Sequence, residues 1–431
     1  MDSNIHKDGG APGLRRGARL DCHGRSRSQP GGWLRGRGPA LLLSAIALLI
    51  PRAFAQQVPH WDVQYFYDQE HSDLAIADLA FPSATRGIAV GTIEDRDGEK
   101  KPRFTAVVTS DAGEHWSLVP LKEQPRSIFF LNESSGWMVT RQGIWFTAEA
   151  GRSWTRIADQ IRPNKKLASA PGSGLLVRLW FLDEKHGYGV GMQKSVYETT
   201  DGGRSWKPVE EAAKPSSNPA YTYYAKIAFS DARHGLIVGG YAAPRRGDDA
   251  DVPDASLPDW MDPERAMRRR EVPTLTLEME TRNAGMTWKS STAPLVGSIA
   301  SLRVGGAEGL AVFGYADSFA WPSEVFRLDL ETGKSASVFK QKDRRVTDTA
   351  VFAGASSTRS PVYLAAVEPP GQMASAPIPG KVKILTSTDL AEWTEMKVDY
   401  RAVAGSVVLA GPDPDHLWAA TDTGMILQLR R

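Results

Sequence analysis

Cysteine is almost absent from this chain of 431 residues, since its single cysteine is Cys22. Cys22 lies in a leader of 55 residues that is rich in Gly, Arg and Ser and differs in composition from the rest of the chain. A mature chain beginning after this leader has no thiol. Disulfides, thiolate catalysis and cysteine-ligated metal sites are therefore excluded.

Long apolar runs are also lacking. The clearest one, Ala40–Ile50, has eleven residues, which is too short to span a bilayer comfortably. Arg35 and Arg37 precede it and Ala53-Phe54-Ala55 follows it as a small-x-small site, so we expect a signal peptide cleaved after Ala55. A buried core helix or a membrane anchor are the alternatives. Translation starting near Leu34 would make 34–55 a signal peptide of ordinary length.

Strong net charge is missing as well. The formal net charge is +2, but the leader holds nine Lys/Arg and three Asp, which leaves residues 56–431 with a net charge of −4. This balance gives no electrostatic case for nucleic-acid binding. We expect an exported protein, periplasmic or extracellular, without an integral membrane segment in the mature chain.

Signatures of catalysis and of cofactor binding are scarce. The sequence has no H-x-x-x-H pair, no glycine-rich phosphate loop before a helix, and none of the F/Y-R-I-P motif that a sialidase carries. Glycoside hydrolysis needs two carboxylates facing one cleft, and no acid sits where the repeats would place an inner-channel pair in adjacent blades. We therefore predict no catalytic residue, no metal and no cofactor, with a glycan-processing or glycan-binding propeller as the alternative.

Two short patterns recur instead. The first places Gly six residues after Phe, in FPSATRG (81–87), FLNESSG (130–136), FLDEKHG (181–187) and FSDARHG (229–235). The second ends on Trp, in TSDAGEHW (109–116), TAEAGRSW (147–154), TTDGGRSW (199–206) and TRNAGMTW (281–288). Short apolar runs flank both patterns and no long helical period appears, so each repeat indicates several short strands.

Four-strand units rich in turn Gly and Trp, recurring every 40 to 60 residues or so, are typical of β-propeller blades. We predict an all-β chain with one propeller domain over 56–431 and seven four-stranded blades. The blades lie near 74–121, 125–158, 174–210, 222–292, 296–340, 345–398 and 401–431. The mature N-terminus (61–67) supplies the last outer strand. Six or eight blades stay open, because the last three repeats are degenerate.

The Trp-ended loop is predicted to be structural. Its acid or amide accepts hydrogen bonds from turn N–H groups, its Gly tolerates positive φ, and its Trp buries an indole between blades. One carboxylate per turn is too few for a calcium loop. The predicted set is Thr109, Asp111, Gly113, Trp116, Thr147, Glu149, Gly151, Trp154, Thr199, Asp201, Gly203, Trp206, Thr281, Asn283, Gly285 and Trp288.

These motifs carry a family resemblance. The loop resembles the Asp box, or BNR repeat, of sialidases and several other propellers. The F-x-(D/N)-x-x-x-G turn, with the apolar-V-G strand after it, resembles the photosystem II assembly and stability factor family across nearly all of 60–431. Glu149, Asn283 and a long insertion (242–272) in blade four depart from that pattern. A second, Pro-rich insertion (368–380) interrupts blade six.

The resemblance implies a monomeric, exported, non-enzymatic propeller that binds a membrane protein or membrane protein complex, such as a photosystem or a transporter. For the binding surface, we predict that the polar residue three before each repeat Phe faces the central channel. These residues are Asp78, Ser127, Arg178 and Lys226. Arg178 and Lys226 would form a basic lip that binds the partner together with Arg268, Arg269 and Arg270 of the insertion. The alternative is that they pair with Asp78 or other channel acids.

Overall fold

The computed structural model describes residues 58–69, 71–162, 175–241, 274–315, 321–353, 360–368, 371–373 and 376–431. All of them belong to one compact unit, Gln56–Arg431. The leader, the predicted cleavage site after Ala55 and the blade-four insertion 242–272 lie outside the described residues.

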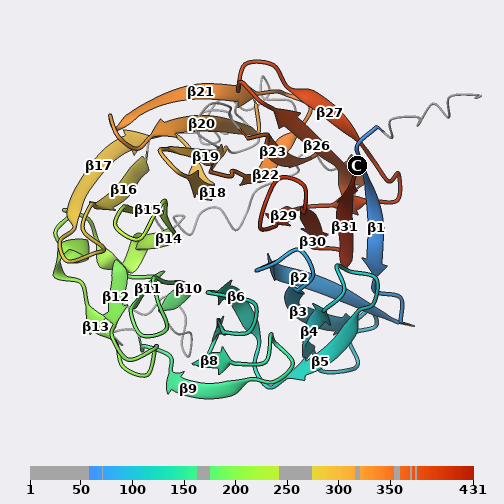
Figure 1. Cartoon of the computed structure of the whole chain (residues 1–431), viewed down its shortest axis with the longest axis horizontal. Helices are drawn as coiled ribbons and strands as arrows, with labels where there is room; N and C mark the ends of the chain where they lie inside the picture. The colour runs from blue at the N-terminus through green and yellow to red at the C-terminus, as the bar shows by residue number, and fades with distance from the viewer. Residues whose placement is uncertain are drawn as a thin grey trace, which may run out of the picture. The chain divides into compact units, whose positions relative to one another are not determined.

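The described strands form seven four-stranded blades arranged in a ring (Figure 1), which confirms the predicted fold class and blade count. Blade one holds β2 (Ser72–Ala80), β3 (Gly87–Asp95), β4 (Arg103–Thr109) and β5 (Ser117–Leu121). Blade two holds β6 (Pro125–Phe130), β7 (Gly136–Thr140), β8 (Gly143–Thr147) and β9 (Thr155–Asp159). Blade three holds β10 (Leu176–Phe181), β11 (Gly187–Gly191), β12 (Ser195–Thr199) and β13 (Lys207–Pro208).

The remaining blades share the same plan. Blade four holds β14 (Thr222–Phe229), β15 (Gly235–Tyr241), β16 (Thr274–Thr281) and β17 (Lys289–Leu295). Blade five holds β18 (Ser298–Gly305), β19 (Glu308–Gly314), β20 (Ser323–Asp329) and β21 (Lys334–Lys340). Blade six holds β22 (Arg345–Ala350), β23 (Val362–Val367), β26 (Gly380–Ser387) and β27 (Thr394–Val398). Blade seven holds β29 (Val407–Ala410), β30 (Trp418–Thr421), β31 (Met425–Arg430) and β1 (His60–Phe66).

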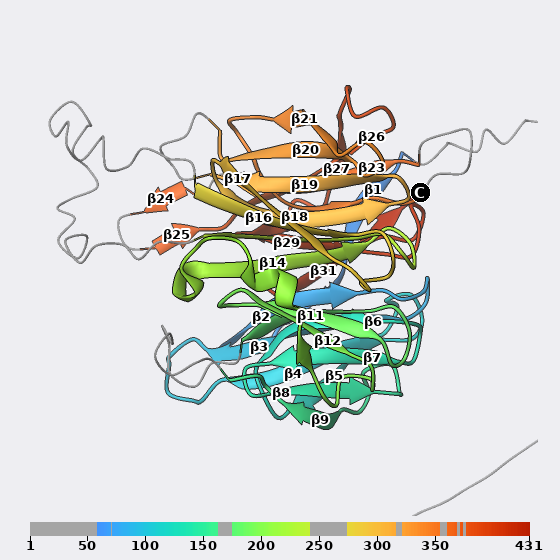
Figure 2. The same cartoon turned by 90° about the vertical axis from the view of Figure 1, so that its left-hand side faces the viewer.

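A few elements lie outside this plan. Two 3-10 helices, η1 (Glu210–Ala213) and η2 (Pro219–Tyr221), connect blades three and four, and β28 (Val403–Ala404) pairs with β26. A small hairpin of β24 (Gly371–Met373) and β25 (Ala376–Ile378) falls within the blade-six insertion. Figure 2 shows that this hairpin projects beyond the blades on one face of the ring.

The innermost strand of each blade contacts that of the next, from β2 to β6, β10, β14, β18, β22 and β29, and β29 contacts β2 again. The ring is thus closed by packing around a central axis. All four strands within each blade are antiparallel, so each blade buries both of its faces against its neighbours.

The Phe-to-Gly pattern has a direct structural cause. In blades one to four the repeat Phe lies at the end of the innermost strand and its ring covers the Gly that begins the next strand. A Cβ on Gly87 would lie 2.2 Å from the Phe81 ring, and one on Gly235 would lie 2.5 Å from the Phe229 ring. Only glycine fits beneath the ring.

The repeat Phe also meets the Trp of its own blade's loop edge-on. The centroids of Phe81 and Trp116 lie 6.1 Å apart at 80°, and Phe181–Trp206 repeats this geometry at 6.3 Å and 76°. Phe130–Trp154 and Phe229–Trp288 do the same at 6.2 Å and 6.1 Å. Edge-to-face pairs at these distances are favourable beyond the area they bury.

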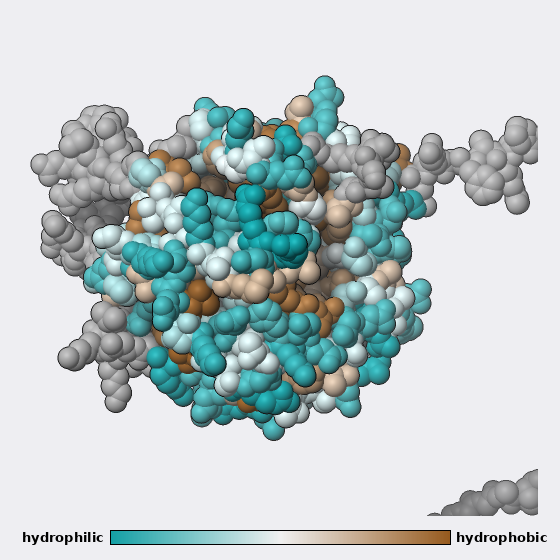
Figure 3. Space-filling model, turned by 60° about the vertical axis from the view of Figure 1, so that its left-hand side comes forward, coloured by the Kyte–Doolittle hydropathy of each residue, from teal (hydrophilic) through white to brown (hydrophobic). Residues whose placement is uncertain are grey.

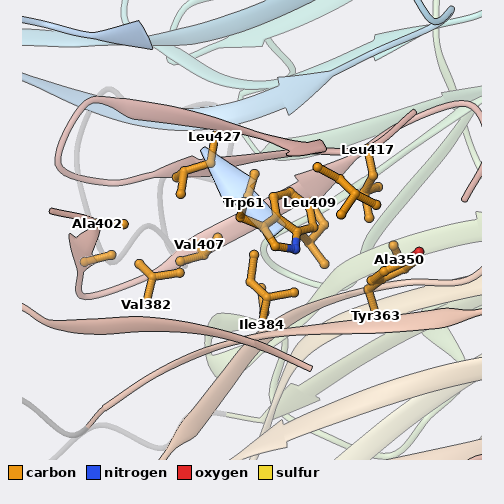
Figure 4. Packing of buried hydrophobic residues seen from close by; sticks show 14 of the residues in the cluster. Trp61, Ala350, Tyr363, Val382, Ile384, Ala402, Val407, Leu409, Leu417 and Leu427 are labelled. Carbon is orange, nitrogen blue, oxygen red and sulfur yellow. The ribbon is translucent and has the colours of Figure 1, made fainter. Parts of the chain in front are cut away.

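The ring closes through the N-terminal strand, as the sequence predicts. β1 pairs antiparallel with β31, and His60 and Trp61 also pair in parallel with Lys397 and Val398 of β27. Blades six and seven thereby merge into one nine-stranded sheet. The Trp61 side chain is fully buried in a cluster with Tyr363, Ile384 and Leu427 (Figure 4), so one indole from β1 fills the space between the last two blades.

We predict that Trp61→Ala lowers the free energy of unfolding by about 3–5 kcal/mol, because it empties this fully buried site. The measurement is urea unfolding followed by circular dichroism. Val58→Ala is the matched control, since Val58 is exposed and precedes the same strand. Equal unfolding free energies for Trp61→Ala and the control would show that β1 does not hold the ring closed.

Candidate functional site

The Trp-ended loops join the third and fourth strands of blades one to four. In each, the Thr hydroxyl accepts a hydrogen bond from the N–H of the loop Gly, at 3.0 Å for Thr109–Gly113, 3.1 Å for Thr147–Gly151 and 2.9 Å for both Thr199–Gly203 and Thr281–Gly285. All four glycines have φ between 82° and 90°. The Thr hydroxyl and the positive φ together fix the turn.

The acid or amide completes the turn from inside the loop. Asp201 Oδ1 accepts from the Thr199 hydroxyl at 2.9 Å and from the Arg204 and Ser205 N–H groups at 3.0 and 2.9 Å. Asn283 has the same role through its amide oxygen, which accepts from Thr281 at 3.0 Å and from the Thr287 N–H at 2.9 Å. A charge is therefore not needed for the loop to form.

Glu149 is the exception among the four. Its carboxylate accepts from the Ser153 hydroxyl at 2.7 Å, while the Thr147 hydroxyl bonds to the backbone N–H groups of Glu149 and Gly151. The longer side chain reaches past the turn amides that Asp would accept. In blade six the shorter loop STDLAEW keeps the turn, because the Leu390 N–H donates to Ser387 Oγ at 2.9 Å and Leu390 itself adopts a φ of 64°.

Within the described residues, one group of potential ligand atoms lies close enough for a metal ion: Asp111, Glu114 and His115. Asp111 already accepts from the Thr109 hydroxyl at 2.8 Å and from the His115 N–H at 3.0 Å, and it lies 2.7 Å from His115 Nδ1. Turn formation thus accounts for the contacts of Asp111 and His115.

The central channel is different. A cavity of about 530 Å³ lies on the ring axis, lined by residues from the innermost strands of all seven blades. Its charged lining residues are Asp78, Arg178, Lys226, Arg303 and Asp348. These come from blades one, three, four, five and six, so the ring brings together side chains that are far apart in the sequence.

A β-bulge in the innermost strand places four of these five side chains, all except Arg303. In blades one to six the register shifts by one residue, and a polar residue stands directly after each shift: Asp78, Ser127, Arg178, Lys226, Ser301 and Asp348. The bulge also brings the two backbones close together, so that a Cβ on Gly191 or Gly239 would lie 1.8 or 1.9 Å from a carbonyl oxygen of the neighbouring strand. This explains the Gly of the apolar-V-G pattern. Bulges commonly re-aim a side chain in this way.

Two of the predicted channel residues do not face open water. Asp78 and Ser127 are 3% and 2% exposed and bond to the next blade instead. Asp78 Oδ2 accepts from the Ile128 N–H at 3.0 Å, and the Ser127 hydroxyl donates to the Val177 carbonyl at 2.8 Å. Asp78 lines the channel cavity as predicted, although its bond to blade two leaves little of it exposed. The prediction was wrong for Ser127, which does not line the cavity because its hydroxyl bonds to the backbone of blade three.

Arg178 and Lys226 do line the cavity, in adjacent blades. Arg178 Nη1 lies 3.5 Å from Asp78 Oδ2, which is the pairing that the alternative interpretation expected. Within the described residues Lys226 makes no hydrogen bond or ion pair. Burial, together with the positive charge of Arg178, lowers the pKa of Lys226 to about 8.

Sequence reasoning missed a second ion pair in the channel. Arg303 donates to Asp348 through Nη2 at 2.7 Å and Nε at 3.2 Å, and Asp348 also accepts from the Leu409 N–H at 3.0 Å. Burial alone would raise the pKa of Asp348, but the charge and hydrogen bonds of Arg303 outweigh it and the pKa is lowered. Blades five and six lack the repeat Phe from which the channel position was counted. Asp348 stands at the bulge position of blade six, but Arg303 comes two residues after the bulge residue of blade five and has no counterpart in the repeat pattern.

The other predicted partner-binding residues, Arg268, Arg269 and Arg270, lie outside the described residues. The charged groups of the channel therefore define the candidate site. Three cations and two carboxylates line it, and both carboxylates are engaged by backbone N–H groups and an arginine. Lys226 is the cation left without such a partner among the described groups.

No protein-family model matches the sequence, and no curated protein matches it. Among solved structures, YCF48 from Cyanidioschyzon merolae is similar with a TM-score of 0.50 and 13% identity, over 86% of this chain and 98% of that chain. A structure of YCF48 bound to D1 peptide has a TM-score of 0.50 and 14% identity, over 86% of this chain and all of that chain. The chain shares the fold of YCF48. An ancestral GH74 enzyme has a TM-score of 0.48 and 11% identity, over 84% of this chain and 46% of that chain.

No helix among the described residues is long and apolar enough to cross a membrane.

The carboxylate of Asp201 should make the free energy of unfolding depend on pH in the acidic range. The Ser205 hydroxyl and N–H lower the pKa of Asp201 to about 2. Because the pKa of Asp201 is lower in the folded chain than in the unfolded chain, where it is about 4, the ionised carboxylate stabilises the fold above pH 4. This contribution to the free energy of unfolding is lost as the pH falls towards 2. Asp201→Asn, which places the same residue as Asn283 in the loop, should make the free energy of unfolding less dependent on pH in this range. Urea unfolding at pH 7 and pH 3 measures it, with Glu114→Asn as an exposed control in blade one. Parallel curves for wild type and Asp201→Asn would contradict the assignment.

The lowered pKa of Lys226 should make the free energy of unfolding depend on pH in the alkaline range. Its pKa is about 8 in the folded chain against a usual value of 10.5, so between these values the unfolded chain binds more protons and the free energy of unfolding rises with pH. Lys226→Met should lack this rise. The check is the difference between the two unfolding curves from pH 7 to 10.5, with the exposed Lys207→Met as control. A rise that persists in Lys226→Met would contradict the lowered pKa.

Proposed function

We propose that this chain is an exported, non-enzymatic propeller that binds a membrane protein or complex and acts as an assembly or stability factor. The observation that carries the proposal is the cation-rich channel, in which Arg178, Lys226 and Arg303 face a cavity with only two carboxylates. A chain terminus or acidic segment of a partner has the complementary charge.

The state of the channel acids supports binding over catalysis. Asp78 and Asp348 each accept backbone N–H bonds and each pair with an arginine. A general acid needs a raised pKa and a free proton, whereas the pKa of Asp348 is lowered. These carboxylates are therefore poorly suited to glycoside hydrolysis.

The resemblance to photosystem II assembly factors and the shared fold support the same proposal. One of the similar structures is YCF48 bound to D1 peptide, so a propeller of this fold holds a peptide. Export rests on the apolar run Ala40–Ile50 and the small-x-small site ending at Ala55. On this basis the partner exposes its binding segment on the outer side of a membrane.

The test is affinity capture from detergent-solubilised membranes of the source cells. Arg178→Glu/Lys226→Glu should lose the partner at low salt, because it reverses the charge at the channel wall. For wild type, capture should weaken as salt rises. The matched control is Arg152→Glu/Lys207→Glu, which makes the same charge change at exposed positions.

The folded state of each variant is checked by thermal unfolding before capture. If the folded channel variant captures the same membrane protein as wild type at both salt concentrations, the partner does not bind at the channel. Loss of capture in the control as well would show a general charge effect and would equally contradict the proposal.

A further inference from the structure

In each complete repeat the indole of the loop Trp packs into the interface between its own blade and the preceding blade. Trp116 packs on Tyr65 of blade seven, Trp154 on the blade-one cluster around Ile88, Trp206 on Trp137 of blade two and Trp288 on Tyr188 of blade three. Trp393 does so between blades five and six. The interface of blades four and five is the place where blade five should supply the next indole.

The β20–β21 hairpin of blade five supplies none, because it is too short. β20 and β21 stay paired up to Asp329 and Lys334, so Leu330–Gly333 form a four-residue turn. In blade one the strands separate at Val108 and Ser117, which leaves the eight residues 109–116. The repeat Phe is absent too, since Val304 stands three residues after the bulge residue Ser301.

A cavity of about 320 Å³ lies at this interface. Its lining includes Leu236 of blade four and Val304, Leu330 and Gly333 of blade five, where the two missing rings would pack. Trp180 and Trp321 touch the apolar cluster of this interface, but neither lines the cavity. Figure 3 views the ring from this side and shows hydrophobic surface between hydrophilic stretches.

The two walls of the cavity differ in character. The blade-five wall is apolar at Phe313, Phe326 and Leu328 and carries Asp329 and Lys334 at its hairpin end. The blade-four wall carries Glu278 and Glu280, at the strand positions where blade one has the buried Ala106 and Val108. Glu278 stands where blades two and three have Ile144 and Val196, whereas the Glu280 position is also acidic in blade three, at Glu198.

The charges that line the cavity are unbalanced. Glu278, Glu280 and Asp329 face one ammonium, Lys334, for a net charge of −2. Arg282, which does not line the cavity, pairs with Glu280 at 2.7 Å, whereas Glu278 accepts the Ser291 hydroxyl at a longer 3.5 Å. Partial burial and the charge of Glu280 raise the pKa of Glu278, which is an exposed residue of its strand. An ammonium beside it would offset the repulsion from Glu280.

We propose that this cavity between blades four and five, called the slot below, binds a small aromatic amine. The ring of the amine lies against Val304, Phe326 and Leu328, and its ammonium lies beside Glu278. The ring takes the space that the missing Phe and Trp leave. The carboxylates select a cation over a neutral or anionic ligand of the same shape. This site is separate from the central channel and does not depend on the proposed function.

The test uses tryptamine, an indole with an ammonium group, and indole-3-propionate, an indole with a carboxylate. Binding to the purified protein is measured by calorimetry and by ligand-observed NMR. Tryptamine should bind and indole-3-propionate should bind at least about tenfold more weakly, since it places a like charge beside Glu278.

Two variants locate the site. Glu278→Gln should weaken tryptamine binding about tenfold, whereas Glu114→Gln, an exposed acid in blade one, should leave it unchanged. Val304→Phe restores the missing repeat ring and should abolish binding while raising the melting temperature. If Val304→Phe fails to fold, Leu328→Phe takes its place as the filling variant.

Failure of tryptamine to bind at millimolar concentration would overturn the proposal. Equal binding of the two indoles would overturn the role of the carboxylates, and binding that survives both Glu278→Gln and the filling variant would place the ligand elsewhere. Loss of binding only in the slot variants, with the Glu114→Gln control intact, supports it.

Discussion

The contact on which the ring depends is the repeat Phe, held between a bare glycine and the edge of an indole. Phe81, Phe130, Phe181 and Phe229 each lie over a Gly that has no room for a Cβ, and each meets its own blade's Trp at about 6 Å. The same Phe rings reach the preceding blade, as Phe181 stacks on Trp137 at 3.7 Å. One ring thus ties a turn, a loop and two blades together, so the loop chemistry serves packing and leaves the channel free for function.

The channel is shaped by the bulges at the other side of each blade. A bulge turns one polar side chain per blade toward the axis or the next blade, and the choice of residue decides which. Short side chains such as Ser127 reach the neighbouring backbone and become structural. The longer Arg178, Lys226 and Arg303 extend into the cavity. Side-chain length and type at the bulge position therefore set the contribution of Arg178 and Lys226 to the channel charge, whereas Arg303 comes two residues after the bulge residue Ser301.

The fold could be predicted in detail where the repeat is complete. In blades one to four both motifs are intact, and the predicted strands and closing strand match those observed. The channel was predicted less well. Burial of Asp78 depends on the Ile128 N–H of another blade, and the Arg303–Asp348 pair joins strands 45 residues apart. Such partners are set by blade-to-blade geometry, which periodicity within one blade does not contain. The hairpin β24–β25 carries no repeat signal and was not foreseen.

The departures from the repeat are the places where side chains are released from packing. In a complete repeat the Phe, Gly, Thr and Trp of the two motifs all pack in the interface between blades, so that none of them is left to bind a ligand. Blade five has lost the Phe and the Trp, and the same blade contributes Arg303 to the channel and the apolar wall of the slot. Filling an interface removes positions that could bind a ligand, whereas leaving one unfilled loses buried apolar area. In a ring of seven blades six other interfaces hold the ring closed when one is weak, so the degenerate repeat is where a binding site can arise without opening the ring.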